Sequence, residues 1–251
     1  IKTNQLEPYM TVYKLLYITP ELSQGYLYLV SNDGYRKDIA QGEAEELMKD
    51  NVNDLLKRLS AEPFNVIDLG CGDGKKAAYL VKNMFEHYPK LKIRYCPIDI
   101  SGYMVSKAIE TFSKLNYGEI VRFQYNISDF ENLENVVPLL RSKEFKRNLL
   151  LLFGNTLGNF EIHELLYTIR KCMKKEDVFV VDTAIDDHNQ KKRAESYQKN
   201  KLWNEFLIHI PLQLGFSRND VEFGVRFRNS RIEAFYNITQ DKEVTFQDKK
   251  V

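Results

Sequence analysis

The stretch VIDLGCGDGKKAAYL, residues 66–80, places Gly70, Gly72 and Gly74 between a β-branched run and a helical pattern. Glycine permits positive φ in a sharp turn, and its missing side chain lets a ligand approach the backbone. The helix that follows offers unpaired N–H groups, which can bind phosphate. Asp68 and Asp73 argue against a pyrophosphate, however, and the lysine and hydroxyl residue of a P-loop are absent. We therefore expect a neutral or positively charged nucleotide-like ligand, with a dinucleotide site or an unliganded tight turn as the alternatives.

Strand-like runs alternate with helical stretches through the middle of the chain. The runs begin at Val66, Lys92, Ile120, Asn148 and Val178. Such alternation is typical of parallel strands joined by helical crossovers, with helices on both faces of the sheet. Two runs, 149–153 and 178–181, are almost wholly apolar, as expected for central strands. The sequence therefore predicts an α/β fold with a doubly wound, Rossmann-like sheet.

The flanking segments predict the remaining parts of the fold. Apolar residues recur at three and four over residues 41–60, the spacing of an amphipathic helix. A polar helix is expected over 191–210, followed by alternating strands over 221–228 and 231–239 around a turn at Asn229-Ser230. We expect this antiparallel hairpin to close a sheet of seven strands. The predicted regions are an N-terminal accessory segment (1–60), a ligand-binding core (61–185), and an accessory helix and hairpin (186–251) that complete a small substrate-binding region.

Two acidic residues are expected at the same edge of the sheet as the glycine turn. Asp99 ends the second strand-like run, and in doubly wound sheets ligands bind across the carboxyl ends of the strands. A carboxylate there can accept both hydroxyls of a ribose, although Asp99 could instead cap the helix that starts at Ser101. Asp129 follows the third run and could accept the amine of an adenine, although an aspartate after a strand is usually a turn residue.

Composition and charge exclude several classes of protein. The 251 residues carry 36 basic and 35 acidic side chains, a net charge of +1, so a strongly basic nucleic-acid binder is not expected. The three cysteines, Cys71, Cys96 and Cys172, form no C-x-x-C pair, which favours a reducing, cytoplasmic compartment over a zinc site. The four histidines lack the spacing of a helical metal pair, and no metal site is predicted.

No segment of the sequence predicts a membrane span or a secretion signal. The longest apolar run, residues 149–153, is far shorter than the roughly 20 residues that a bilayer requires. The first ten residues lack a charged region followed by an apolar one. We therefore expect neither membrane insertion nor a membrane partner.

The chain resembles class I S-adenosylmethionine (SAM)-dependent methyltransferases in its glycine turn, Asp99 and the pair Asp129-Phe130. The run LLLLFGNTLGNFEIHE, residues 149–164, is more specific. Together with YCPIDIS, residues 95–101, it is similar to the histidine Nα-methyltransferase family of the ergothioneine pathway. The likeness runs from about Phe64 to Ile238 and implies a Rossmann-like core with a smaller substrate region built from N-terminal and late segments.

The resemblance implies a set of site residues. The cofactor-binding positions are Asp68, Gly70, Gly72, Lys76, Asp99, Ile100, Asp129, Phe130 and Gly154. Asn159 matches the asparagine that holds the substrate amine and carboxylate, Tyr197 resembles a carboxylate-binding tyrosine, and Glu233 resembles the acid that grips the imidazole. The alternative roles are a helix N-cap for Asn159, a half-packed surface residue for Tyr197 and a solvent-facing acid of the hairpin for Glu233, and for Asn159 the functional role is favoured. The substrate-specifying residues after the acid are replaced here by Ala234-Phe235-Tyr236, and the N-terminal tyrosine motif of the family has no counterpart.

The function expected from the sequence is SAM-dependent N-methylation of the α-amine of an amino acid or a related small amine. Histidine is the default substrate of the family. Methyl transfer from a sulfonium requires alignment rather than a nucleophilic side chain, and the sequence has no obvious catalytic triad or metal motif. The alternatives are a different acceptor, such as a peptide terminus, a polyamine or a hydroxyl, and a SAM-binding module without activity.

Overall fold

Five parallel strands form the central sheet, in the order β3-β2-β1-β4-β5. Their bounds are β1 (Phe64–Leu69), β2 (Ile93–Ile98), β3 (Glu119–Ile120), β4 (Arg147–Leu152) and β5 (Val178–Val181). The computed structural model describes residues 16–33, 41–60, 62–154, 156–183, 189–228, 231–240, 245–246 and 249–250. β1 lies in the middle and pairs in parallel with β2 and β4. The predicted doubly wound sheet is confirmed.

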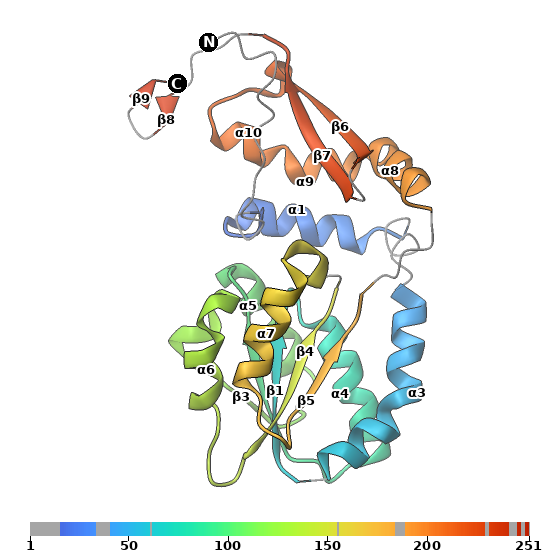
Figure 1. Cartoon of the computed structure of the whole chain (residues 1–251), viewed down its shortest axis with the longest axis vertical. Helices are drawn as coiled ribbons and strands as arrows, with labels where there is room; N and C mark the ends of the chain where they lie inside the picture. The colour runs from blue at the N-terminus through green and yellow to red at the C-terminus, as the bar shows by residue number, and fades with distance from the viewer. Residues whose placement is uncertain are drawn as a thin grey trace.

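Helices cover both faces of this sheet (Figure 1). α3 (Gln41–Leu59), α4 (Lys75–His87) and α5 (Gly102–Ser113) share one hydrophobic cluster with one face of β1, β2 and β4. α6 (Leu133–Leu139) and α7 (Ile162–Cys172) pack against the other face. All six residues of β1 are buried, because a central strand with helices on both sides has no solvent face.

A second layer lies beyond the carboxyl ends of the strands. It contains α1 (Pro20–Ser31), α8 (Gln190–Lys199), α9 (Lys201–Leu207), α10 (His209–Gln213), β6 (Val221–Arg228) and β7 (Arg231–Ile238). Figure 1 shows α1 between the sheet and this late segment. Leu22 and Leu29 of α1 pack with Phe206 and Leu207 of α9 in a hydrophobic cluster of their own. α1 and the late segment are therefore packed together.

Short elements complete the described structure. They are η2 (Gln124–Asn126), η3 (Phe130–Asn132), η4 (Thr156–Asn159), η5 (Arg218–Asp220), β8 (Thr245–Phe246) and β9 (Lys249–Lys250). Across the described part of the chain, none of the helices combines the length and apolar character needed to cross a membrane.

The hairpin differs from the sequence-based expectation. β6 and β7 pair with each other over eight residue pairs and form a separate two-stranded sheet, so among the described residues they do not close the central sheet or bring it to seven strands. Alternating apolar residues predict that two strands pair, but they do not specify which sheet the pair joins. The hairpin instead packs against α8 and contacts α9 through Tyr236, whose hydroxyl donates to Asn204 at 2.8 Å. The predicted turn at Asn229-Ser230 lies outside the described residues.

Two helical expectations also need correction. The single helix expected over 191–210 is divided, because Asn200 ends α8 and its side chain caps α9 by accepting from the N–H of Leu202 at 3.0 Å. α1 was not predicted at all, although Thr19 at its N-cap followed by Pro20 is a typical helix start. The limits predicted for the three regions stay predictions.

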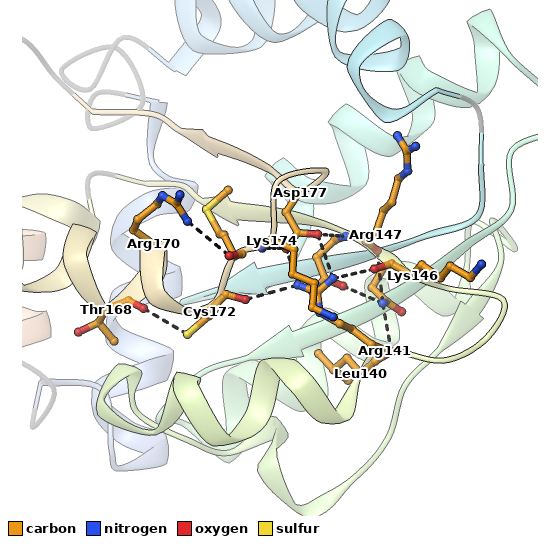
Figure 2. Close-up of polar contacts among 12 residues, drawn as sticks. Leu140, Arg141, Lys146, Arg147, Thr168, Arg170, Cys172, Lys174 and Asp177 are labelled. Atoms are coloured by element: carbon orange, nitrogen blue, oxygen red, sulfur yellow. Dashed lines mark hydrogen bonds and ion pairs between the residues drawn. The ribbon is translucent and has the colours of Figure 1, made fainter.

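A polar network fixes the amino ends of β4 and β5 (Figure 2). The fully buried Asp177 carboxylate accepts from the backbone N–H groups of Asn148 at 2.9 Å and Lys174 at 2.7 Å, and it pairs with Arg141. The Arg141 guanidinium also donates to the Lys146 carbonyl at 2.7 Å. A buried charge is tolerated when it is paired and hydrogen-bonded in this way. The network lies at the end of the sheet opposite the glycine turn and has a structural role.

Candidate active site

A cavity of about 540 Å³ lies over the carboxyl ends of β1, β2 and β4. Its volume falls within the range typical of small-molecule sites. The structure brings ten of the sequence-predicted residues to its walls: Asp68, Gly70, Gly72, Lys76, Asp99, Ile100, Asp129, Phe130, Gly154 and Asn159. This cavity is called the cleft below.

The glycine turn forms the floor of the cleft. The N–H groups of Gly70 and Cys71 donate to the Ile98 carbonyl at 2.8 and 3.2 Å, which ties the turn to the end of β2. Gly72 has a φ of +52°, and a Cβ added there would meet no atom within 4 Å. The backbone of Gly72 is therefore open to a ligand. At Gly74 a side chain is disfavoured for a different reason, which is lack of space. A Cβ there would lie 2.9 Å from the Cα of Ala108, because α4 and α5 approach closely.

Asp99 lies at the end of β2 beside this turn. Its Oδ2 accepts from the N–H of Gly72 at 3.1 Å, and its Oδ1 accepts from the N–H of Ser101 at 2.9 Å. The N-cap of α5 is Ser101, which accepts from the N–H of Met104, so Asp99 is not the N-cap residue itself. Burial raises the pKa of Asp99 above its ordinary value. A carboxylate offers about four lone-pair sites, so Asp99 can still accept from a ligand hydroxyl.

Asp68 lies beneath the turn and is only 3% exposed. The Tyr95 hydroxyl donates to its Oδ2 at 2.7 Å. Burial raises the pKa of Asp68 from 3.8 to about 7, and the Tyr95 hydrogen bond opposes that rise. The floor of the cleft therefore holds a carboxyl group that titrates near neutral pH.

Asp129 and Phe130 form one end of the cleft. The Asp129 side chain caps η3 by accepting from the N–H of Glu131 at 3.1 Å, so the turn role considered from the sequence is present as well. The rings of Phe130 and Phe160 have centroids 5.2 Å apart. Aromatic side chains beside a carboxylate suit a flat base that carries an amine.

Lys76 and Gly154 meet at the opposite wall through a residue that the sequence analysis missed. Asp182, directly after β5, lies 2.6 Å from Lys76 Nζ and accepts from the N–H of Gly154 at 2.5 Å. Its position at a strand end follows the same rule as that of Asp99 and was a usable signal. Lys75 instead points to solvent, with a side chain 74% exposed and 2.6 Å from Asp73.

Asn159 and the α1 helix also line the cleft. Asn159 is half-buried at the end of η4, and the N-cap of α7 is Glu161, so the capping alternative for Asn159 does not hold. Tyr26 of α1 and Tyr17, three residues before this helix, also line the cleft. Burial raises the pKa of Tyr26 above its ordinary value, which keeps its hydroxyl neutral. Neither tyrosine could be assigned to the site from the sequence, because nothing in the local pattern indicates which core surface the α1 helix will cover.

The structure does not bring Tyr197 and Glu233 to the cleft. The Tyr197 ring packs on Trp203, with centroids 4.6 Å apart. Glu233 accepts from Arg226 Nε at 2.9 Å, and Arg228 Nε lies 3.9 Å away. Their roles in binding the methyl acceptor stay predictions. Among the described residues, no group of three or more histidine, cysteine, aspartate or glutamate side chains is placed to hold a metal ion.

Comparison with known proteins assigns the chain to a class and then to a family. The class is that of the SAM-dependent methyltransferases. Residues 40–251 match the model of a family described as histidine-specific methyltransferase, SAM-dependent, and the chain belongs to this family. No curated protein matches the chain.

Among solved structures, the chain is similar to magnesium protoporphyrin IX methyltransferase from Synechocystis PCC 6803. For the crystal structure of that enzyme with bound SAM, the sequence identity is 11%, the alignment covers 92% of this chain and 97% of that chain, and the TM-score is 0.44. With bound SAH, the identity is 14%, the coverage 88% and 95%, and the TM-score 0.45. A SAM-dependent methyltransferase from Methanococcus maripaludis, described as putative in its own title, is 14% identical, with coverage of 80% and 94% and a TM-score of 0.35. The assignment rests on the family match.

Proposed function

We propose that this chain methylates the α-amine of an amino acid, with histidine as the first candidate. The observation that carries the proposal is the placement of Asn159 in the same cleft as the glycine turn and Asp99. The glycine turn and Asp99 are of the type that binds a nucleoside, and Asn159 is of the type that orients an amino acid.

The lining of the cleft fits SAM. The open backbone at Gly72 and Gly154 leaves room for a ligand, since a Cβ at either residue would meet nothing within 4 Å. In this proposal Asp99 accepts the ribose hydroxyls, Asp129 and Phe130 receive the adenine, and Lys76 pairs with the carboxylate of the methionine part; all four line the cleft. When bound, SAM supplies an electrophilic methyl group on a sulfonium.

The charge of the cleft favours cationic ligands. Its acidic lining residues outnumber the basic ones, Lys75 and Lys76; they are Asp68, Asp73, Asp99, Asp129, Glu131, Glu161 and Glu164. A cleft lined mainly by one sign of charge attracts ligands of the other sign. A sulfonium and a protonated amine both carry that charge, whereas a phosphate-bearing nucleotide does not.

Asn159 orients the acceptor in this proposal. Its amide offers both donors and an acceptor, so it can hold an amine and a carboxylate without changing protonation with pH. Fixing two reactants in near-attack geometry contributes on the order of 7–11 kcal/mol to catalysis. No side chain of the cleft has to act as a nucleophile. Tyr197 and Glu233 enter the proposal only through the family resemblance, because neither lines the cleft.

The proposal is tested with SAM carrying an isotopically labelled methyl group and a panel of amino acids, small amines and peptides, read by mass spectrometry. We expect label on the α-amine of an amino acid. Asn159→Ala is expected to lose most turnover and to keep its affinity for SAM. Asn135→Ala, on the exposed surface of α6, is the matched control and keeps full activity. Label only on another class of acceptor contradicts the amino-acid proposal, and no label on any acceptor favours a SAM-binding module.

A further inference from the structure

Asp182 joins two walls of the cleft. Its Oδ2 lies 2.6 Å from Lys76 Nζ on α4, and its Oδ1 accepts from the N–H of Gly154 in the loop after β4. The Lys76 and Asp182 side chains are 23% and 19% exposed, so the ion pair is largely shielded from solvent. Lys76 and Gly154 line the cleft, whereas Asp182 is not among the lining residues. Asp182 therefore contacts the lining of the cleft through Lys76 and Gly154.

Lys76 is the cation best placed to receive an anionic group of a ligand. The other lysine of the cleft, Lys75, is mostly exposed and lies beside Asp73. The Lys76 ammonium is already neutralised by Asp182. A carboxylate that approaches Lys76 therefore also approaches the negative charge of Asp182, and at short range in a partly buried site this repulsion is weakly screened.

We propose that Asp182 is the resident counter-ion of Lys76 and that it limits the affinity of the cleft for the carboxylate of the cofactor. This inference rests on the proposed use of the cleft for SAM. When the cofactor carboxylate binds, it displaces Asp182 from Lys76 or shares Lys76 with it. The hydrogen bond from the N–H of Gly154 to Asp182 is kept. Methyl transfer converts SAM into S-adenosylhomocysteine, which carries the same carboxylate. A lysine that already has a partner releases this product more readily, and release often limits turnover.

The test compares ligands that do and do not carry the carboxylate. Asp182→Asn removes the charge and keeps an oxygen that can accept from the N–H of Gly154. Dissociation constants are measured by calorimetry for SAM, S-adenosylhomocysteine and 5′-methylthioadenosine, which has the nucleoside and sulfur but no carboxylate. We expect SAM and S-adenosylhomocysteine to bind about tenfold more tightly to Asp182→Asn and 5′-methylthioadenosine to bind unchanged. Glu86→Gln is the matched control, because it removes the acid 3.9 Å from another α4 lysine, Lys82, outside the cleft, and it leaves all three constants unchanged.

Three results overturn the inference. The first is unchanged or weaker binding of SAM to Asp182→Asn. The second is an equal change in affinity for all three ligands, which indicates an altered shape of the cleft. The third is a gain in affinity that persists when Lys76→Met is added to Asp182→Asn. If Asp182→Asn does not fold, Asp182→Ser gives the same test, since a hydroxyl also accepts a hydrogen bond. Failure of the wild-type protein to bind any of the three ligands removes the proposed cofactor site itself, which is a different outcome.

Discussion

The hydroxyl oxygens of Ser23 and Ser101 lie 2.7 Å apart, and both side chains are fully buried between α1 and the core. Ser23 also donates to the Tyr17 carbonyl at 2.8 Å, so Ser101 is the donor in the serine pair. The N–H of Ser101 in turn donates to Asp99. One chain of hydrogen bonds thus connects the helix that covers the cleft to the carboxylate proposed to hold the ribose.

Replacing Ser23 by alanine is expected to loosen α1. The Ser101 hydroxyl is then buried without its acceptor, which costs about 1–3 kcal/mol. Amide hydrogen exchange in α1 should speed up, and SAM affinity should fall, because Tyr26 of this helix and Tyr17 just before it line the cleft. Ser113→Ala, on the exposed end of α5, is the control. Unchanged exchange in α1 would show that the serine pair does not hold the helix in place.

The pH dependence of stability should report the buried Asp68. Its folded-state pKa of about 7 lies above the ordinary 3.8, so folding favours the protonated form. The stabilisation is present below the unfolded pKa and is lost as pH rises through the folded pKa. Between about pH 4 and about pH 8 the wild type should lose on the order of 4 kcal/mol relative to Asp68→Asn. Denaturant unfolding of both proteins measures the difference, and parallel pH profiles would contradict the assignment.

Alkylation of cysteine should report occupancy of the cleft. All three cysteines are buried, and burial raises the pKa of each, to about 12 for Cys96 and about 11 for Cys172. Iodoacetamide should therefore modify the folded protein slowly. Cys71 is the cysteine that lines the cleft, so SAM should protect it and leave the rates at the other two unchanged. Peptide mapping by mass spectrometry separates the three sites. Equal protection of all three would indicate general stabilisation rather than a ligand beside Cys71.

The resemblance assigns Glu233 to the acceptor, and one variant tests this role. Glu233→Gln is expected to raise the KM for the acceptor and to leave SAM affinity unchanged, because the loss of charge weakens a contact to a cationic group. Glu222→Gln, an exposed acid on the paired strand, is the control. An acceptor profile identical to that of the wild type would leave Glu233 as the structural partner of Arg226.

The sequence predicted the parts of the fold that depend on local pattern. The apolar runs and the glycine turn were sufficient to predict the parallel sheet. The positions of Asp99 and Asp129 after strand-like runs were sufficient to predict that both lie at the cleft. Placement of elements far apart in the chain was not predictable in this way. The position of α1 depends on a buried contact between Ser23 and Ser101, which are 78 residues apart in the sequence. The hairpin packs with α8 and α9, and these helices contribute surfaces that no strand pattern encodes.

The most direct measurement is calorimetric titration of SAM into the wild-type protein and into Asp99→Ala. We expect the wild type to bind one SAM per chain. We expect at least about thirtyfold weaker binding to the variant, since hydrogen bonds to a charged group are lost. Asp54→Ala, which removes an exposed acid on α3, should bind as the wild type does. Absence of SAM binding, stronger binding of ATP than of SAM, or equal affinity in the wild type and a folded Asp99→Ala would contradict the central claim.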